Sequence, residues 1–418
     1  MAKSHGKSFH IIYFFLQPFF TLLYYLKNFR KPEAKNVMWL FTIFYGFTFA
    51  IGVENQNSDI NSYVNDIPLL HNLNLTFSGF LVYHKATGEV DILRNSLAYV
   101  VSYFTANGYY LIIIYGIIYG YFFSRNMWYV LDRLEGKTKM FTKVLIFGLF
   151  LSIPIWGLNG FRFWTAAHVF IFILLPYLFE GKKKRLVWCL IIPFVIHYSF
   201  LIALFPLLIY LIFGNKVKLY YIFFIITLFI SAINLSQFNN LIETYAPQSF
   251  ADRSASYRLE TKVKTLRTEG QFGADQVWYV KYAGFGIRYS LAAFLLAFYW
   301  TFRKSIHSNK ELLKLLSFTL LFYGFANILS SIPSGYRFLK VADVLTLSFL
   351  ILHLQNNKIN RDLYYLANIT TPLFLLFIIV GLRASWYSLS VMTIIGNPIT
   401  AIFTFGENIS LNDIIKGL

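Results

Sequence analysis

The chain has 418 residues, of which 57% are hydrophobic, 20% aromatic and only 13% charged, whereas a soluble globular protein carries about 25% charged residues. This composition excludes a large soluble domain and predicts an all-α, polytopic integral membrane protein, with one transmembrane domain over 1–418. The net charge of +18 does not indicate a nucleic-acid partner. Its Lys and Arg residues stand in short loops between apolar runs, where they set topology and contact anionic membrane lipids.

The apolar runs follow one another along the chain with few gaps. They cover 9–26, 37–53, 108–123, 140–158, 163–179, 186–213, 219–235, 285–302, 314–331, 338–355, 363–382 and a candidate at 388–405. The run 186–213 is too long for one span, so we predict two short helices with His197-Tyr198-Ser199 at the turn between them. About 12–13 transmembrane helices result. The segment 95–106 is too short to span and is expected to lie at the interface. Cys189, the only cysteine, stands in an apolar run and is expected in the core.

Short basic loops set the expected orientation by the positive-inside rule. The loops assigned to the cytoplasm are 27–35, 124–139, 181–185, 215–218, 303–314 and 356–361. The loops that then fall outside are 54–95, 155–162, the turn at His197, 236–284 and 332–337. Of these, 54–95 and 236–284 are long external loops, and long loops in compact proteins often carry function. The N-terminus comes out external, although Lys3 and Lys7 favour the opposite side.

Several ionisable groups stand where the predicted helices meet the outer face. They are Arg162, His197, Arg253, Arg258, Arg288 and Arg337. A charged group at a helix centre costs about 2.5–3.5 kcal/mol on insertion scales, and positive charge outside runs against the usual orientation bias. We therefore interpret the set as a pocket for an anionic, lipid-linked substrate.

Arginines open three of these helices at their outer ends. Arg162 shares a face with Asn159, and its planar fork of donors suits a phosphate, although snorkelling to headgroups would explain it as well. Arg288 and Arg337 have the same placement. Arg253 and Arg258 belong to a basic amphipathic stretch that most simply faces lipid headgroups, or that folds over the pocket as a lid.

Two groups qualify as a base. His197 at the predicted outer turn has an imidazole suited to general-base work, or it is a hydrogen-bonding filler; His168 and His353 sit in helix interiors and are expected to be structural. Asp59 and Tyr63 follow the second span and fall on one face with Asp66 if that segment is helical. The alternative for them is a solvated loop.

Other chemistries lack a signal. The sequence has no Asp-x-Asp and no His/Cys cluster at ligand spacing, so no metal site and no cofactor are expected. It has no phosphate-binding glycine loop of the P-loop kind. Lys340 and Asp343, three residues apart within a predicted span, are expected to neutralise each other.

The order of these motifs resembles the EpsG-like and Wzy-type polysaccharide polymerases of O-antigen, capsule and exopolysaccharide. The matching motifs are SDINSY after the second span, NGFRFWTAA at a middle helix, the Ile-His-Tyr-Ser turn and GYRF at a late helix. The family often has an arginine just ahead of its Gly-x-Asp-x-x-x-Tyr-like segment, and GVENQNSD has none here.

The resemblance implies the fold of O-antigen polymerases and ligases, which is GT-C-like, and a reaction on the outer face of the bacterial inner membrane. The donor would be a glycan on undecaprenyl pyrophosphate and the acceptor a repeat unit on a second carrier; a chain-length regulator protein is a further candidate partner. On this hypothesis Arg162 and Arg337 hold pyrophosphate with Arg288 in support. His197 is the preferred base and Asp59 the second. Tyr63 and Tyr198 line the pocket.

Three alternatives use the same residues differently. An O-antigen ligase would need the same pocket with another acceptor. A flippase or transporter of lipid-linked oligosaccharide would need a deep cationic cavity that opens to each face in turn. A membrane acyltransferase would need its histidine on the cytosolic side, opposite to the expected position of His197.

Overall fold

Helices dominate the computed structural model, which describes residues 5–53, 56, 58–88, 90–230, 277–301, 309–330, 334–357 and 360–417. About 80% of these residues are helical, and they contain no β-strand, only an isolated bridge between Ser390 and Ser410. The predicted all-α class is therefore confirmed for the described part of the chain. Its helices group into two compact units.

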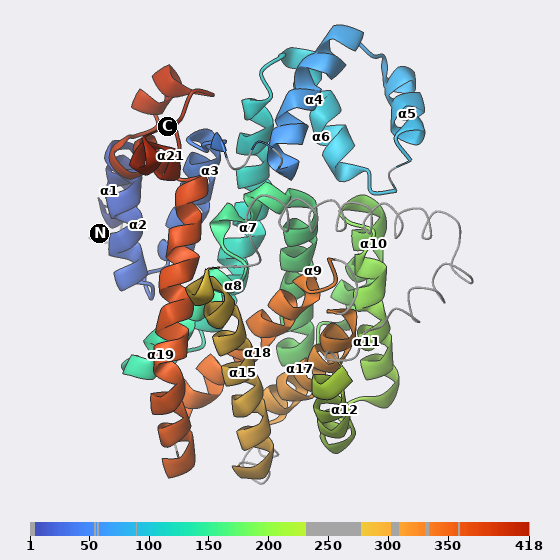
Figure 1. The fold of residues 1–418 in the computed structure, drawn as a ribbon, viewed down its shortest axis with the longest axis vertical. Coiled ribbons are helices and arrows are strands. Elements are labelled where there is room, and N and C mark those ends of the chain that lie inside the picture. The colour runs from blue at the N-terminus through green and yellow to red at the C-terminus, as the bar shows by residue number, and fades with distance from the viewer. Residues whose placement is uncertain are drawn as a thin grey trace. The chain divides into compact units, whose positions relative to one another are not determined.

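Unit 1 comprises residues 1–134, 153–202 and 381–418. Its helices (Figure 1) are α1 His5–Leu16, α2 Pro18–Lys27, α3 Ala34–Phe47, α4 Asp59–Leu73, α5 Phe77–Ala86, α6 Leu93–Phe104, α7 Tyr109–Leu131, η2 Ile155–Gly160, α9 Phe161–Glu180, η3 Lys183–Leu186, α10 Val187–Val195, η4 Ser385–Tyr387, α20 Val391–Ile395, η5 Thr400–Thr404 and α21 Leu411–Lys416. Helix α7 packs along both α3 and α9, and α4 packs on α6.

Unit 2 comprises residues 135–152 and 203–380. Its helices are α8 Met140–Ser152, most of α11 Phe200–Phe213, α12 Val217–Ile230, α15 Trp278–Thr301, α17 Lys310–Leu329, α18 Arg337–Asn356 and most of α19 Arg361–Ala384. Helix α18 packs against α8, α15 and α17, and α17 also packs along α12. Consequently α18 is the central helix of this unit, buried along almost its whole length.

Four stretches of the described chain are long and apolar enough to cross a membrane. They are Met140–Glu180, Lys310–Leu329, Arg337–Asn356 and Arg361–Tyr387. The first is interrupted at Ile153 and Pro154, between α8 and α9. Helix α19 is apolar yet only 22% of its spanning window is buried, so most of its apolar side chains face outward. An outward apolar face is what contact with lipid tails requires.

Several predicted boundaries are confirmed and others are wrong. The run 186–213 does form two helices, α10 and α11, with the His197 turn between them. The run 9–26 is broken at Gln17, because Pro18 begins α2 and cannot continue α1. The candidate span 388–405 forms only short helical turns. Helix α7 continues to Leu131, into the predicted loop 124–139, and α15 begins at Trp278, inside the predicted loop 236–284.

The segment 54–95 is largely helical, because it contains α4, α5 and the start of α6 (Figure 1). The chain just before it is held by the C-terminal segment: the Val53 N–H donates to Asp413 Oδ2 over 3.2 Å. Gly52 permits this approach, since a Cβ there would lie 2.6 Å from the same carboxylate oxygen. The C-terminal segment thus fixes the point from which α4 starts.

Candidate functional site

Helix α4 packs into the rest of unit 1 through an apolar face, and this face carries one polar group, the Tyr63 hydroxyl. The side chains buried on this face are Ile60, Tyr63, Val64, Ile67 and Leu70, which follow the i, i+3, i+4, i+7 spacing of an amphipathic helix. Tyr63 is only 6% exposed, so its hydroxyl needs a partner inside the protein.

Arg162, at the start of α9, provides that partner. Its Nε donates to Tyr63 Oη over 3.0 Å, and its Nη1 donates to Asp91 Oδ2 over 3.3 Å. The Asp91 side chain is 2% exposed, whereas that of Arg162 is 24% exposed. The pair therefore has a buried carboxylate and a guanidinium that also reaches solvent.

A second arginine covers Tyr63 from α6. The Arg94 guanidinium lies 4.4 Å from the centre of the Tyr63 ring and forms an ion pair with Asp66. Its Nη1 donates to Asn95 Oδ1 over 2.6 Å, while its buried Nε has no partner among the described residues. Burial lowers the pKa of Arg94, but a guanidinium keeps its charge in proteins.

Stacked rings fix the position of this cluster. Tyr115 of α7 stacks on Phe161, with ring centres 3.6 Å apart and planes inclined by 5°, and meets the Tyr63 ring edge-on at 6.3 Å. Phe161 directly precedes Arg162, so α7 positions both the tyrosine and the arginine. We call Tyr63, Asp66, Asp91, Arg94 and Arg162 the unit 1 cluster; its two arginines are balanced by two aspartates.

The Tyr63 phenol yields a pH prediction. Burial raises its pKa to about 12 from the ordinary 10.0, against the opposing effect of Arg162. The folded state keeps this proton to higher pH than the unfolded chain, so its stabilising contribution is complete below pH 10 and is lost as pH rises toward 12. In wild type the unfolding free energy should fall across that window by an extra amount on the order of 2 kcal/mol, and Tyr63→Phe should remove this extra fall.

The measurement is denaturant unfolding in detergent below and above pH 10, for wild type and Tyr63→Phe. A constant offset between the two proteins is expected from the lost hydrogen bond with Arg162, whereas the slope with pH should differ. Parallel pH profiles would contradict the assignment. Tyr103→Phe, at an exposed tyrosine of α6, is the matched control and should leave the slope unchanged.

Asp59 and His197 lie in unit 1 and are accessible. Asp59 is the first residue of α4, exposed, where a negative charge suits the helix N-terminus. It is close enough to Tyr63 and Arg94 to act on both electrostatically. His197 is half-buried, and its ring packs edge-on against Phe163, with 5.5 Å between ring centres. Of the two candidate bases, Asp59 thus stands at the start of α4, and His197 stands beside the first turn of α9.

Unit 2 contains a separate polar network. Arg288 Nη2 donates to Asn327 Oδ1 over 3.2 Å and lies within electrostatic reach of Asp343. The Tyr323 hydroxyl donates to Asp343 Oδ1 over 3.1 Å, and Lys340 Nζ lies 3.8 Å from Asp343 Oδ2. The predicted Lys340–Asp343 pair is therefore present, and Asp343 has two further neighbours that the sequence did not indicate.

Arg337 is the first residue of α18 and is half-buried. Ser334, three residues earlier, adopts a φ of 62°, a left-handed conformation that costs energy for serine and often marks functional turns. Lys340 lies on the same face of α18 as Arg337. Asp343 lies six residues after Arg337, about 9 Å further along the helix axis. Further along α18, Lys340 and the Arg288 side chain of α15 lie within electrostatic reach of the buried Asp343.

The structure divides the predicted site residues between the units. Arg162, Tyr63, Asp59, His197 and Tyr198 belong to unit 1. Arg288 and Arg337 belong to unit 2. Arg253 and Arg258 lie outside the described residues. Tyr198 is half-buried in the turn, where its carbonyl accepts the Leu201 N–H at 3.0 Å.

Two members of the unit 1 cluster were missed from the sequence. Asp91 and Arg94 stand in VDILRN, three residues apart, immediately before the predicted interfacial segment 95–106. Two opposite charges three residues apart, at the start of an apolar helix, were the sequence signal that could have indicated a polar site here. Their spacing suggests a pair with each other, yet each instead pairs with a residue far away in the sequence. His168 is buried and bonded to Asn126 and Tyr119, as a structural histidine should be.

Fold and site together define a helical protein with helices suited to a membrane and with two arginine-containing polar clusters. Among the described residues, no three His, Cys, Asp or Glu side chains gather where they would hold a metal ion. No known protein family, curated protein or solved structure matches the chain.

Proposed function

We propose that the chain is a membrane glycosyltransferase that polymerises undecaprenyl-pyrophosphate-linked repeat units into O-antigen, capsule or exopolysaccharide. It would act on the outer face of the bacterial inner membrane, within a polytopic, GT-C-like fold of about 12–13 spans. The observation that carries the proposal is the hydrogen bond from Arg162 to Tyr63. It joins two of the motifs on which the resemblance rests, although 99 residues separate them.

The cations at the N-terminal end of α18 support binding of the leaving group. Pyrophosphate leaves with negative charge that arginines can stabilise without a metal. Arg337 is our first candidate for this role, because it is the first residue of α18 and is half-buried. Arg337 stands at a helix N-terminus, where backbone N–H groups and the helix dipole also favour an anion. Lys340 of α18 and Arg288 of α15 add positive charge near Asp343, further along α18.

The unit 1 cluster is better suited to hold a neutral sugar than a second pyrophosphate, because its charges are balanced. Of its two arginines, Arg162 is the partly exposed one, with 24% of its side chain accessible, and would present N–H donors to the sugar. An acceptor hydroxyl would then lose its proton to His197, with Asp59 as the second choice. Direct attack on the anomeric carbon with departure of lipid pyrophosphate inverts that centre.

The test is complementation of a strain that lacks this chain. Wild type should restore a ladder of glycan lengths, and His197→Ala at an equal membrane level should leave mainly single repeat units. Ser199→Ala, in the same turn, is the matched control and should keep the ladder. Single repeat units with wild type would contradict the polymerase and favour a ligase. A full ladder with His197→Ala would remove His197 as the base but leave the proposed function standing.

A flippase of lipid-linked oligosaccharide is the second candidate, and the buried Asp343 network favours it, because ionisable groups inside membrane helices often line transport paths. The two functions differ in where substrate collects without the protein. A flippase defect traps carrier-linked units on the cytoplasmic side, whereas a polymerase defect leaves single units outside.

A further inference from the structure

Unit 2 contains a cavity of about 480 Å³ at one end of α12, α15 and α17. Helix α12 begins at Val217, α17 begins at Lys310 and α15 ends at Thr301, so the cavity lies where three helices end. Its volume falls within the range of about 300–1,000 Å³ that small-molecule sites occupy. It belongs to neither of the two clusters described above.

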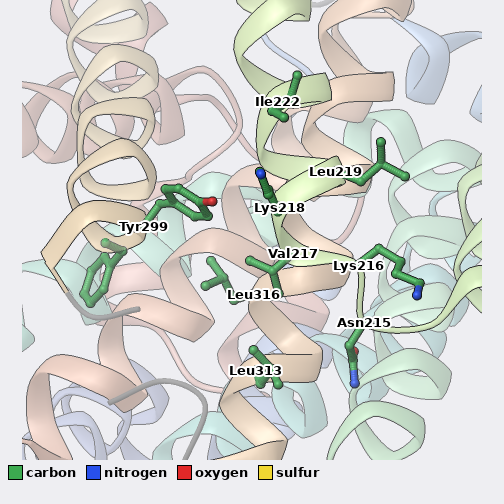
Figure 2. A pocket seen from close by; sticks show the side chains of 10 residues that line it. Asn215, Lys216, Val217, Lys218, Leu219, Ile222, Tyr299, Leu313 and Leu316 are labelled. Carbon is green, nitrogen blue, oxygen red and sulfur yellow. The ribbon is translucent and has the colours of Figure 1, made fainter. Parts of the chain in front are cut away.

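The lining of this cavity is polar in one part and apolar in the other. The polar lining residues are Asn215, Lys216, Lys218 and Tyr299. Among the described residues that line the cavity, the others, such as Leu313 and Leu316, are apolar and none is acidic. Figure 2 shows that the Tyr299 hydroxyl is directed toward Lys218. Asn215 and Lys216 lie on another side of the cavity, and apolar side chains lie between the two polar parts.

The polar part is held in place by tyrosines. The Tyr210 hydroxyl donates to Asn215 Oδ1 over 2.6 Å, and the Tyr220 hydroxyl donates to the Gly214 carbonyl over 2.9 Å. Gly214 has a φ of 63°, which glycine adopts without strain. Tyr299 stacks on Tyr221 with ring centres 3.8 Å apart. The Asn215 amide and the Tyr299 ring are therefore held in place before any ligand arrives, which lowers the entropy cost of binding.

We propose that this cavity binds one anionic phospholipid of the surrounding membrane. Lys218 would hold the phosphate with the Tyr299 hydroxyl as a further donor. Lys216, on another side of the cavity, would add electrostatic attraction to the anionic headgroup, and the first part of an acyl chain would lie on the apolar wall. A lipid fits better than a soluble anion, because Leu219 and Ile222, on the same helix as the lysines, are exposed apolar side chains. The loop 215–218 is also expected on the cytoplasmic side, whose leaflet is anionic.

Native mass spectrometry of the full chain in detergent tests this proposal, with dioleoyl-phosphatidylglycerol, dioleoyl-phosphatidylcholine and inorganic phosphate as probes. Wild type should retain one phosphatidylglycerol in preference to phosphatidylcholine. The double change Lys216→Gln and Lys218→Gln should weaken phosphatidylglycerol binding about 30-fold and leave phosphatidylcholine binding unchanged. Lys183→Gln with Lys184→Gln removes the same charge from an exposed loop of unit 1 and should change neither.

A second variant separates loss of the site from loss of the fold. Ile222→Trp fills the cavity from an exposed position and keeps both lysines, so it should also abolish the selective binding. Equal weakening by the Lys183 and Lys184 control would overturn the proposal, since the effect would be one of overall charge. Competition by inorganic phosphate alone would also overturn it, because the ligand would then be a soluble anion.

Discussion

Arg337→Ala is expected to lower the rate of polymer formation about 10²–10³-fold, the usual effect of removing one donor from a developing negative charge. The expectation follows from the proposed role of Arg337 as the first residue of α18, at the helix N-terminus. Arg337→Lys should recover part of the rate, because it keeps the charge and loses the planar fork. The measurement is the initial rate of glycan elongation by purified protein with a lipid-linked repeat unit.

Arg361→Ala is the matched control for this prediction. Arg361 also begins a helix of unit 2, but it is exposed, and its guanidinium donates to the Tyr365 hydroxyl one turn further along the same helix. Its loss removes the same charge and should leave the rate within about twofold, as expected for an exposed surface change. A normal rate with Arg337→Ala would contradict the role of Arg337 in holding pyrophosphate.

Arg162→Ala should destabilise the protein more than Asp91→Ala, although both break the same ion pair. Without Arg162, the Asp91 carboxylate stays buried and uncompensated, and removal of one partner of a buried pair costs about 3–5 kcal/mol. Without Asp91, the Arg162 side chain, 24% exposed, can turn toward solvent, so we expect a cost of about 1–2 kcal/mol. The double variant should be more stable than the sum of the two effects predicts.

Unfolding free energies of the four proteins of this cycle, measured with denaturant in detergent, give the coupling directly. The pair Arg133–Glu180 is the control, with an N–O distance of 2.9 Å and both side chains about one-third exposed. Its cycle should give a coupling below about 1 kcal/mol, as exposed pairs do. Equal coupling in the two cycles would mean that burial of Asp91 has no energetic consequence.

The helical class and the order of the helices followed from the sequence, because apolar runs and basic loops are local signals. The split of 186–213 around His197 was predictable from its excess length. The break at Pro18 needed only the rule that proline ends a helix, yet continuous hydropathy obscured it. The failure of 388–405 to form a long helix has the same origin, since hydropathy reports apolar character and not helical continuity.

The partners of the site residues were beyond the sequence. Periodicity placed Tyr63 and Asp66 on one face of a helix, but it did not indicate that Arg94 would pair with Asp66 or that Asp91 would neutralise Arg162. These contacts join α4, α6 and α9, so they depend on how the helices of unit 1 pack and not on any local pattern.

The sequence by itself determined that this is a helical chain with apolar, membrane-type segments, because burial of backbone polar groups in an apolar environment requires helices. It also indicated that Arg162 and Arg337 stand at helix starts, but it was wrong for Arg288, which lies in the interior of α15 because that helix begins at Trp278. Only the tertiary structure decided the charge state of their surroundings. It pairs Arg162 with the buried Asp91 and Arg94 with the half-buried Asp66, because pairing between ionised groups depends on distance in space and not on separation along the chain.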